Sequence, residues 1–151
     1  MSLKDRIGDD MKTAMRARDA DRLSAIRMLV AAVRQKEIDE RIQLDDAQTI
    51  AVVERLSKQR RDSIEQYEQA GRHELAAREK FELDVLAGYL PQPASAEELD
   101  GEIDAAIAAT SAASLQDIGK VMGLLKQRLA GRADLSKVSA QVRERLSASR
   151  G

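Results

Sequence analysis

Hydrophobic residues recur every three to four positions along most of the chain. Leu3, Ile7, Met11 and Met15 form the first such series, and this spacing places their side chains on one face of a helix. No stretch of useful length alternates with a period of two, so we expect no strands. The pattern predicts an all-α protein.

Polar residues that can cap a helix precede most of the hydrophobic series, and they set most of the expected boundaries. The expected helices begin at Ser2, run over about 21–39, 45–70 and 72–89, and begin again at Ser95, Ser114 and Asp134. Four of these starts have the spacing of a capping box, namely Ser2 with Asp5, Asp45 with Gln48, Ser95 with Glu98 and Ser114 with Asp117.

Two prolines interrupt the helical pattern at Pro91-Gln92-Pro93. Each proline ring removes a backbone donor and restricts the residue before it, so helical structure ends there. We therefore expect an N-terminal helical domain of about four helices over residues 1–91. A C-terminal three-helix domain follows over residues 95–151.

Composition removes several classes of function. The 151 residues include no cysteine and only one histidine, His73, so thiolate sites and sites with two imidazoles are excluded. Glu79 and Glu82 stand beside Arg78 and Lys80, which indicates a mixed-charge helix face rather than a catalytic pair. No phosphate-cradling glycine loop or metal-ligand spacing is present, and we expect no catalytic centre, cofactor or metal.

The same composition argues against a membrane protein. No run approaches the roughly 20 apolar residues that a transmembrane helix needs. The first six residues include Lys4, Asp5 and Arg6, too many charges for the apolar region of a signal peptide. We therefore expect a cytoplasmic protein with no membrane partner.

Charge is distributed unevenly within the C-terminal domain. Residues 95–113 contain five acids and no base, whereas residues 114–151 contain eight bases and three acids. The bases are Lys120, Lys126, Arg128, Arg132, Lys137, Arg143, Arg145 and Arg150. A local cationic surface attracts phosphates. Alternatively, these bases lie on solvated helix faces, where the helix dipole favours them near C-terminal ends.

The expected third helix contains a second anomaly, because residues 57–63 have no apolar side chain. A helix that packs along its whole length would place a core residue in that interval. Either this part leaves the core, or Lys58, Arg60 and Arg61 face a polar groove or a partner. A solvated span with an Arg61–Glu65 pair is the simpler alternative.

Several segments together resemble one family. Gly119-Lys120-Val121-Met122-Gly123 and Gly131-Arg132-Ala133-Asp134 resemble the signature of the GatB/YqeY family. Segments 22–29, 58–63 and 89–91 are similar to the stand-alone YqeY-like proteins. The resemblance covers nearly the whole chain.

The resemblance implies an all-helical, two-domain protein. Its C-terminal part is similar to the tail domain of the B subunit of the glutamine-dependent tRNA amidotransferase. That tail contacts tRNA, while the chemistry occurs elsewhere. The family motif falls on Gly119, Lys120, Met122, Gly131, Arg132 and Asp134. The family is often filed under amidotransferase activity, a carbon–nitrogen ligase with glutamine as amide donor, but no nucleophile or ATP site is visible in this sequence.

The motif also has a direct physical interpretation. Gly119 and Gly123, four residues apart, leave a shallow strip on a helix where a nucleic-acid backbone can approach closely. Close packing between helices is the alternative reason for these glycines. We expect a non-catalytic module that binds tRNA or another structured RNA, with phosphate contacts from Lys120, Lys126, Arg128, Arg132 and Lys137. The alternative is an interaction adaptor for an amidotransferase subunit or an aminoacyl-tRNA synthetase.

Overall fold

The computed structural model describes residues 1–148, and all their regular structure is helical. The helices are α1 (Leu3–Arg16), α2 (Ala20–Glu40), α3 (Asp46–Gln69), α4 (His73–Ala87), α5 (Ala96–Thr110), α6 (Ile118–Arg128) and α7 (Leu135–Ala148). A short 3₁₀ turn, η1 (Leu115–Asp117), leads into α6. The prediction of an all-α protein is confirmed. Arg150, one of the expected bases, lies outside the described residues.

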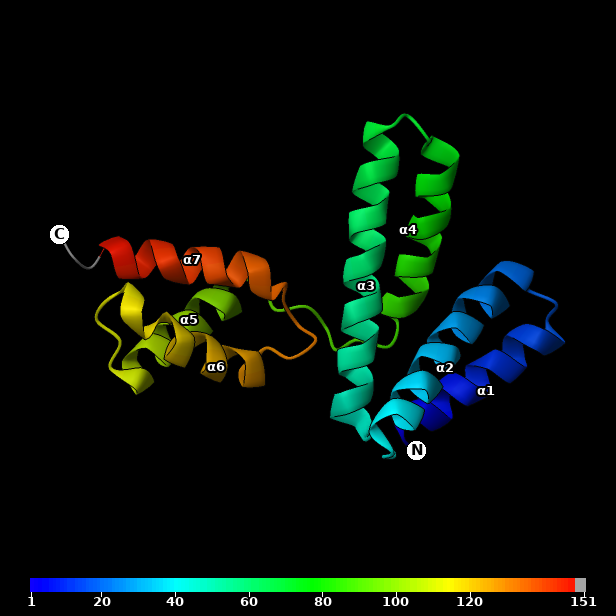
Figure 1. The fold of residues 1–151 in the computed structure, drawn as a ribbon, viewed down its shortest axis with the longest axis horizontal. Coiled ribbons are helices and arrows are strands. Elements are labelled where there is room, and N and C mark those ends of the chain that lie inside the picture. The colour runs from blue at the N-terminus through cyan, green and yellow to red at the C-terminus, as the bar shows by residue number, and fades with distance from the viewer. Residues whose placement is uncertain (149–151) are drawn as a thin grey trace. The chain divides into compact units, whose positions relative to one another are not determined.

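The chain divides into two compact units, Met1–Leu90 and Pro91–Gly151. In the first unit α3 and α4 pack along one another, and α1 packs on α2 (Figure 1). The core includes Ile26, Leu29 and Val53, which have no exposed surface. Burial of such side chains stabilises the unit by about 1.5–3 kcal/mol per residue.

The second unit has a core of its own. Eight buried residues from α5 to α7 form it, namely Ile103, Ala106, Val121, Leu125, Leu129, Val138, Val142 and Leu146. The chain turns after α6 at Gly131, whose φ of 75° lies in the region that glycine adopts without steric cost. The apolar layer between α5, α6 and α7 is thus buried, and the outer sides of these helices carry polar residues.

Most of the expected capping boxes form. The Ser2 and Asp45 boxes are complete, with both reciprocal hydrogen bonds. At α5 the Ser95 hydroxyl accepts from the backbone N–H of Glu98 at 3.1 Å. The Glu98 carboxylate, however, accepts from Arg132. The capping box at Ser95 is therefore only half formed. The Glu98 carboxylate, which would accept from the Ser95 backbone N–H in a complete box, instead binds Arg132, 34 residues later in the chain.

Candidate functional site

The side of α6 that faces away from the core carries two glycines and two lysines. We call Gly119, Lys120, Gly123 and Lys126 the α6 outer face; all four are exposed. At about 100° per residue, they lie opposite Val121 and Leu125, which are fully buried. The periodicity that packs α6 on its neighbours thus also presents these four residues to solvent.

The two glycines are not used for packing in the part of the chain that the structure describes. A Cβ atom added to Gly119 or Gly123 would meet no heavy atom within 4 Å. The alternative that these glycines admit a neighbouring helix is therefore wrong for residues 1–148. A glycine in an exposed helix interior costs about 1 kcal/mol relative to alanine, so α6 keeps an open notch at a cost in stability.

The two lysines of this face are free of salt bridges to the described residues. The nearest acid along the chain, Asp117, accepts hydrogen bonds from the backbone N–H groups of Ala113 at 2.9 Å and Ser114 at 3.3 Å. These bonds hold the pKa of Asp117 below its ordinary value, and the charge of Lys120 lowers it further. Asp117 thus caps η1 and forms no salt bridge with Lys120.

The arginines expected to bind phosphate behave differently. The guanidinium of Arg132 lies 2.5 Å from the Glu98 carboxylate and donates to the backbone carbonyl of Gln92 at 3.0 Å. Arg128 lies 3.5 Å from Glu102. These two side chains hold α5 and the segment before it against α6, so they belong to the fold rather than to a free cationic surface.

Arg145 on α7 continues the same arrangement. Its guanidinium reaches Asp100 at 2.6 Å and Asp104 at 2.5 Å. Four of the five acids between residues 95 and 113 therefore face arginines from α6, α7 or the turn between them. The uneven charge distribution is, in large part, a set of contacts between helices. Over residues 91–148, eight acids stand against seven bases.

The remaining motif residues have local roles. Met122 is half-buried and packs against the apolar core of the second unit. The carboxylate of Asp134 accepts from the backbone N–H of Ser136 at 3.0 Å, at the start of α7. Lys137 is exposed in the first turn of α7, on a different helix from the α6 outer face.

The polar interval of α3 is partly buried against α4. Ser57 is only 2% exposed. The Arg60 guanidinium lies 2.8 Å from Glu82 and 3.2 Å from Glu79, and it also contacts the sulfur of Met28. Arg60 is therefore engaged inside the unit, while Lys58 and Arg61 are exposed.

The expected mixed-charge face at Glu79 and Glu82 packs against α3 and pairs with Arg60. Both carboxylates are half-buried and share one guanidinium. Burial raises the pKa of Glu79; Arg60 lowers it, and Glu82 raises it further. Arg60 thus pairs with both carboxylates across two helices, whereas the buried Ser57 hydroxyl has no hydrogen-bond partner among the described residues. The lack of apolar residues in this interval does not by itself require an external partner.

Two further findings concern metals and membranes. Among residues 1–148, no group of three or more histidine, cysteine, aspartate or glutamate side chains is placed to hold a metal ion. No helix in that range combines the length and apolar character that a membrane crossing requires.

The fold and this surface define a two-unit, all-helical protein whose C-terminal unit presents a glycine-notched helix. Residues 4–146 match the family described as Yqey-like protein. The chain belongs to this family, and the resemblance seen in the sequence is confirmed.

Curated relatives carry a different name. The chain is 37% identical over 99 residues to "Altered inheritance of mitochondria protein 41, mitochondrial" of Eremothecium gossypii, covering 64% of this chain and 54% of the relative. Its counterpart in Lachancea thermotolerans is 37% identical, with 65% and 52% covered. That of Saccharomyces cerevisiae strain YJM789 is 34% identical over 92 residues, with 60% and 50% covered. The chain spans about half the length of the curated relatives it matches.

These names contradict the expectation of a cytoplasmic protein, because the relatives are named as mitochondrial. The expectation rested on the missing apolar leader and missing membrane span. Those features bear on secretion and membrane insertion, and they do not distinguish one aqueous compartment from another.

Proposed function

We propose that this Yqey-like protein is a binding module for structured RNA, tRNA in the first instance, and that the α6 outer face makes the contact. One observation carries the proposal: α6 keeps two exposed glycines with open space above them, and unpaired lysines flank them. A ribose-phosphate backbone can approach a helix closely where no Cβ projects. Lysine ammonium groups then neutralise the adjacent phosphates.

The proposal rests on fewer residues than the sequence suggested. Arg128 and Arg132 are left out because each faces a carboxylate of α5. Lys120 and Lys126 are the principal contacts, and Lys137 is a peripheral one. Only three aromatic residues occur in the chain, so recognition rests on shape and phosphate contacts rather than on base stacking. The association with tRNA follows from the similarity to the amidotransferase tail domain.

Binding of the purified full chain to total tRNA at increasing salt tests the proposal. We expect K120E/K126E to weaken binding at least tenfold. We also expect it to reduce the log–log salt slope by about 2, since each phosphate contact contributes roughly 0.9.

The matched control is K12E/R55E, which changes the net charge equally at two exposed positions of the first unit. The control should bind as the unaltered protein does. Equal affinities and slopes for K120E/K126E and the unaltered protein would overturn the proposal.

A further inference from the structure

The outer face of α2, in the first unit, carries a row of arginines. Arg27, Arg34 and Arg41 are spaced by seven residues, and all three are exposed. Seven residues are close to two helical turns, so Arg27 and Arg34 fall on one stripe of α2. Arg41 follows as its left-handed C-cap, with a φ of 55°. No salt bridge joins these arginines to any described residue.

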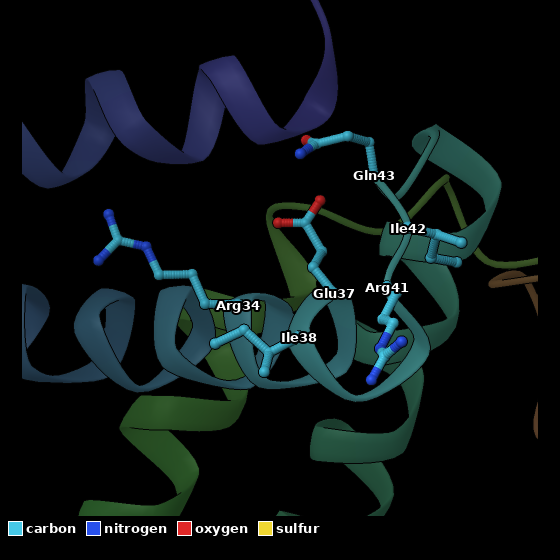
Figure 2. A pocket seen from close by; sticks show the side chains of 6 residues that line it. All are labelled: Arg34, Glu37, Ile38, Arg41, Ile42 and Gln43. Carbon is cyan, nitrogen blue, oxygen red and sulfur yellow. The ribbon is translucent and has the colours of Figure 1, made fainter.

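Apolar side chains lie between the arginines. Two adjoining hollows of about 410 and 440 Å³ share Arg34 and Ile38 in their linings. Met11 of α1 and Val30 line one hollow, and Ile42 lines the other. Ile38 is 69% exposed, and Figure 2 shows it between Arg34 and Arg41. Together these residues make a shallow apolar groove with cationic edges.

The acid within this groove is already satisfied. The Glu37 carboxylate accepts from the Lys4 ammonium at 2.7 Å and from the backbone N–H of Leu44 at 2.9 Å. In Figure 2 it is turned toward Gln43. These bonds, that to Lys4 foremost, lower the pKa of Glu37. Glu37 remains ionised, and the charges of both Lys4 and Arg34 act on it. The lining of the two hollows still holds three arginines against this one carboxylate, so the groove is net positive.

We propose that this groove docks an acidic amphipathic helix of a partner protein. The apolar floor fits the buried stripe of such a helix, and carboxylates on either side would pair with the arginine guanidinium groups. From Arg27 to Arg41 the face extends about 21 Å, which matches a helix of about 14 residues. A nucleic-acid backbone would satisfy the arginines but would leave Ile38, Val30 and Met11 uncovered. A protein helix uses both features of the groove.

Site-specific photo-crosslinking in cells that express the full chain tests the docking surface. A benzophenone side chain replaces Ile38, and the matched control carries it at Leu75, an exposed apolar position on α4. We expect position 38 alone to give a protein crosslink that resists nuclease. Mass spectrometry should map it to a segment with acidic residues flanking an apolar stripe.

A synthetic peptide of the captured segment then measures affinity by fluorescence anisotropy. We expect R27E/R34E to weaken binding at least tenfold, and R55E to leave it unchanged. A nuclease-sensitive crosslink, a crosslink to a second copy of this chain, the same product from position 75, or no product would each overturn the proposal. These variants leave the α6 outer face unchanged. Their effect on peptide binding therefore tests the docking proposal alone, and tRNA binding is measured separately.

Discussion

The guanidinium of Arg132 lies 2.5 Å from the carboxylate of Glu98, 34 residues earlier in the chain. This pair turns a residue of the family motif into a connection between α5 and the turn after α6. The sequence alone suggests that the Arg132 charge is free to bind a ligand, but in the structure it pairs with Glu98. Variants at this position should report on stability before they report on any ligand.

We expect R132A to lower the stability of the second unit, because it removes the contacts to Glu98 and to the Gln92 carbonyl together. E98Q should lower it less, since the contact to Gln92 remains. The double variant R132A/E98Q should cost less than the sum of the two single variants. Urea denaturation of all four proteins measures this coupling, and strict additivity would contradict a direct interaction.

Acidic pH should weaken the second unit. The pKa of Glu98 is lowered by Arg132 first, and that of Asp117 by the backbone N–H groups of Ala113 and Ser114. A lowered pKa contributes stability that is present above the ordinary value, 4.5 for Glu98 and 3.8 for Asp117, and is lost as pH falls through the folded-state pKa. Denaturation midpoints across this range should fall with pH, and D117N should flatten the decline.

In the cluster of Arg60, Glu79 and Glu82, removal of the guanidinium and removal of a carboxylate charge should change stability in opposite directions. Removal of the guanidinium in R60M leaves two half-buried carboxylates without it and should cost about 2 kcal/mol, somewhat less than for a fully buried pair. E79Q should raise stability at pH 7, because the raised pKa of Glu79 means that its charged form is disfavoured in the folded state.

The pH dependence of this cluster provides the check. With a folded-state pKa above 4.5, Glu79 makes the protein more stable as pH falls through that pKa. The E79Q variant should not show this increase in stability at lower pH. The E65Q variant, altered at an exposed position of α3, should still show it. A stability loss in E79Q at pH 7 would show that the carboxylate is needed in its ionised form.

Tyr89 joins the end of the first unit to α1. Its hydroxyl donates to Asp10 at 2.7 Å, and the Arg6 guanidinium lies 5.1 Å from the ring centroid. Burial raises the pKa of Tyr89 most, and the hydrogen bond to Asp10 raises it further. Y89F keeps the ring but removes the donor, and it should cost about 1 kcal/mol. Y67F, at a half-buried position on α3, is the matched control and should cost less. Thermal unfolding of both variants measures the difference.

Replacement of Gly123 and of Gly131 by alanine should change the free energy of unfolding in opposite directions. G123A should raise the free energy of unfolding by about 0.5–1 kcal/mol, because alanine favours the helix and its Cβ meets open space. G131A should lower it by about 1 kcal/mol or more, because φ is 75° there. Under the RNA-binding proposal, G123A also weakens tRNA binding, so stability and affinity move apart in one variant.

The sequence predicted local features well. The capping boxes at Ser2 and Asp45 depend on residues three positions apart, and both form as expected. The all-α fold follows from hydrophobic spacing, which local geometry determines. The helix break at Pro91 and Pro93 likewise follows from the proline ring.

Partners distant in sequence could not be predicted in the same way. Arg60 meets Glu79 and Glu82 only because α3 and α4 pack along one another, and Arg145 meets Asp100 only because α7 lies on α5. Hydrophobic spacing identifies the buried face of each helix but not the helix that covers it. For the same reason, the sequence left open whether Gly123 is packed or exposed.

The arginine row on α2 was missed, although it carried a signal. The seven-residue spacing of Arg27, Arg34 and Arg41 is visible in the sequence. It became informative once the structure showed that these arginines form no salt bridge with a described residue and that Ile38 is exposed between two of them. Regularly spaced arginines point to a binding surface only when the structure shows that they form no salt bridge within the protein.

The open notch at Gly119 and Gly123 has a consequence for laboratory evolution. Selection for thermal resistance alone should replace both glycines with alanine early, because each exchange strengthens the helix without a steric penalty. Selection that also demands the biological activity should retain them. Sequencing the survivors of the two regimes in parallel would show directly whether these two positions are maintained by something outside the polypeptide.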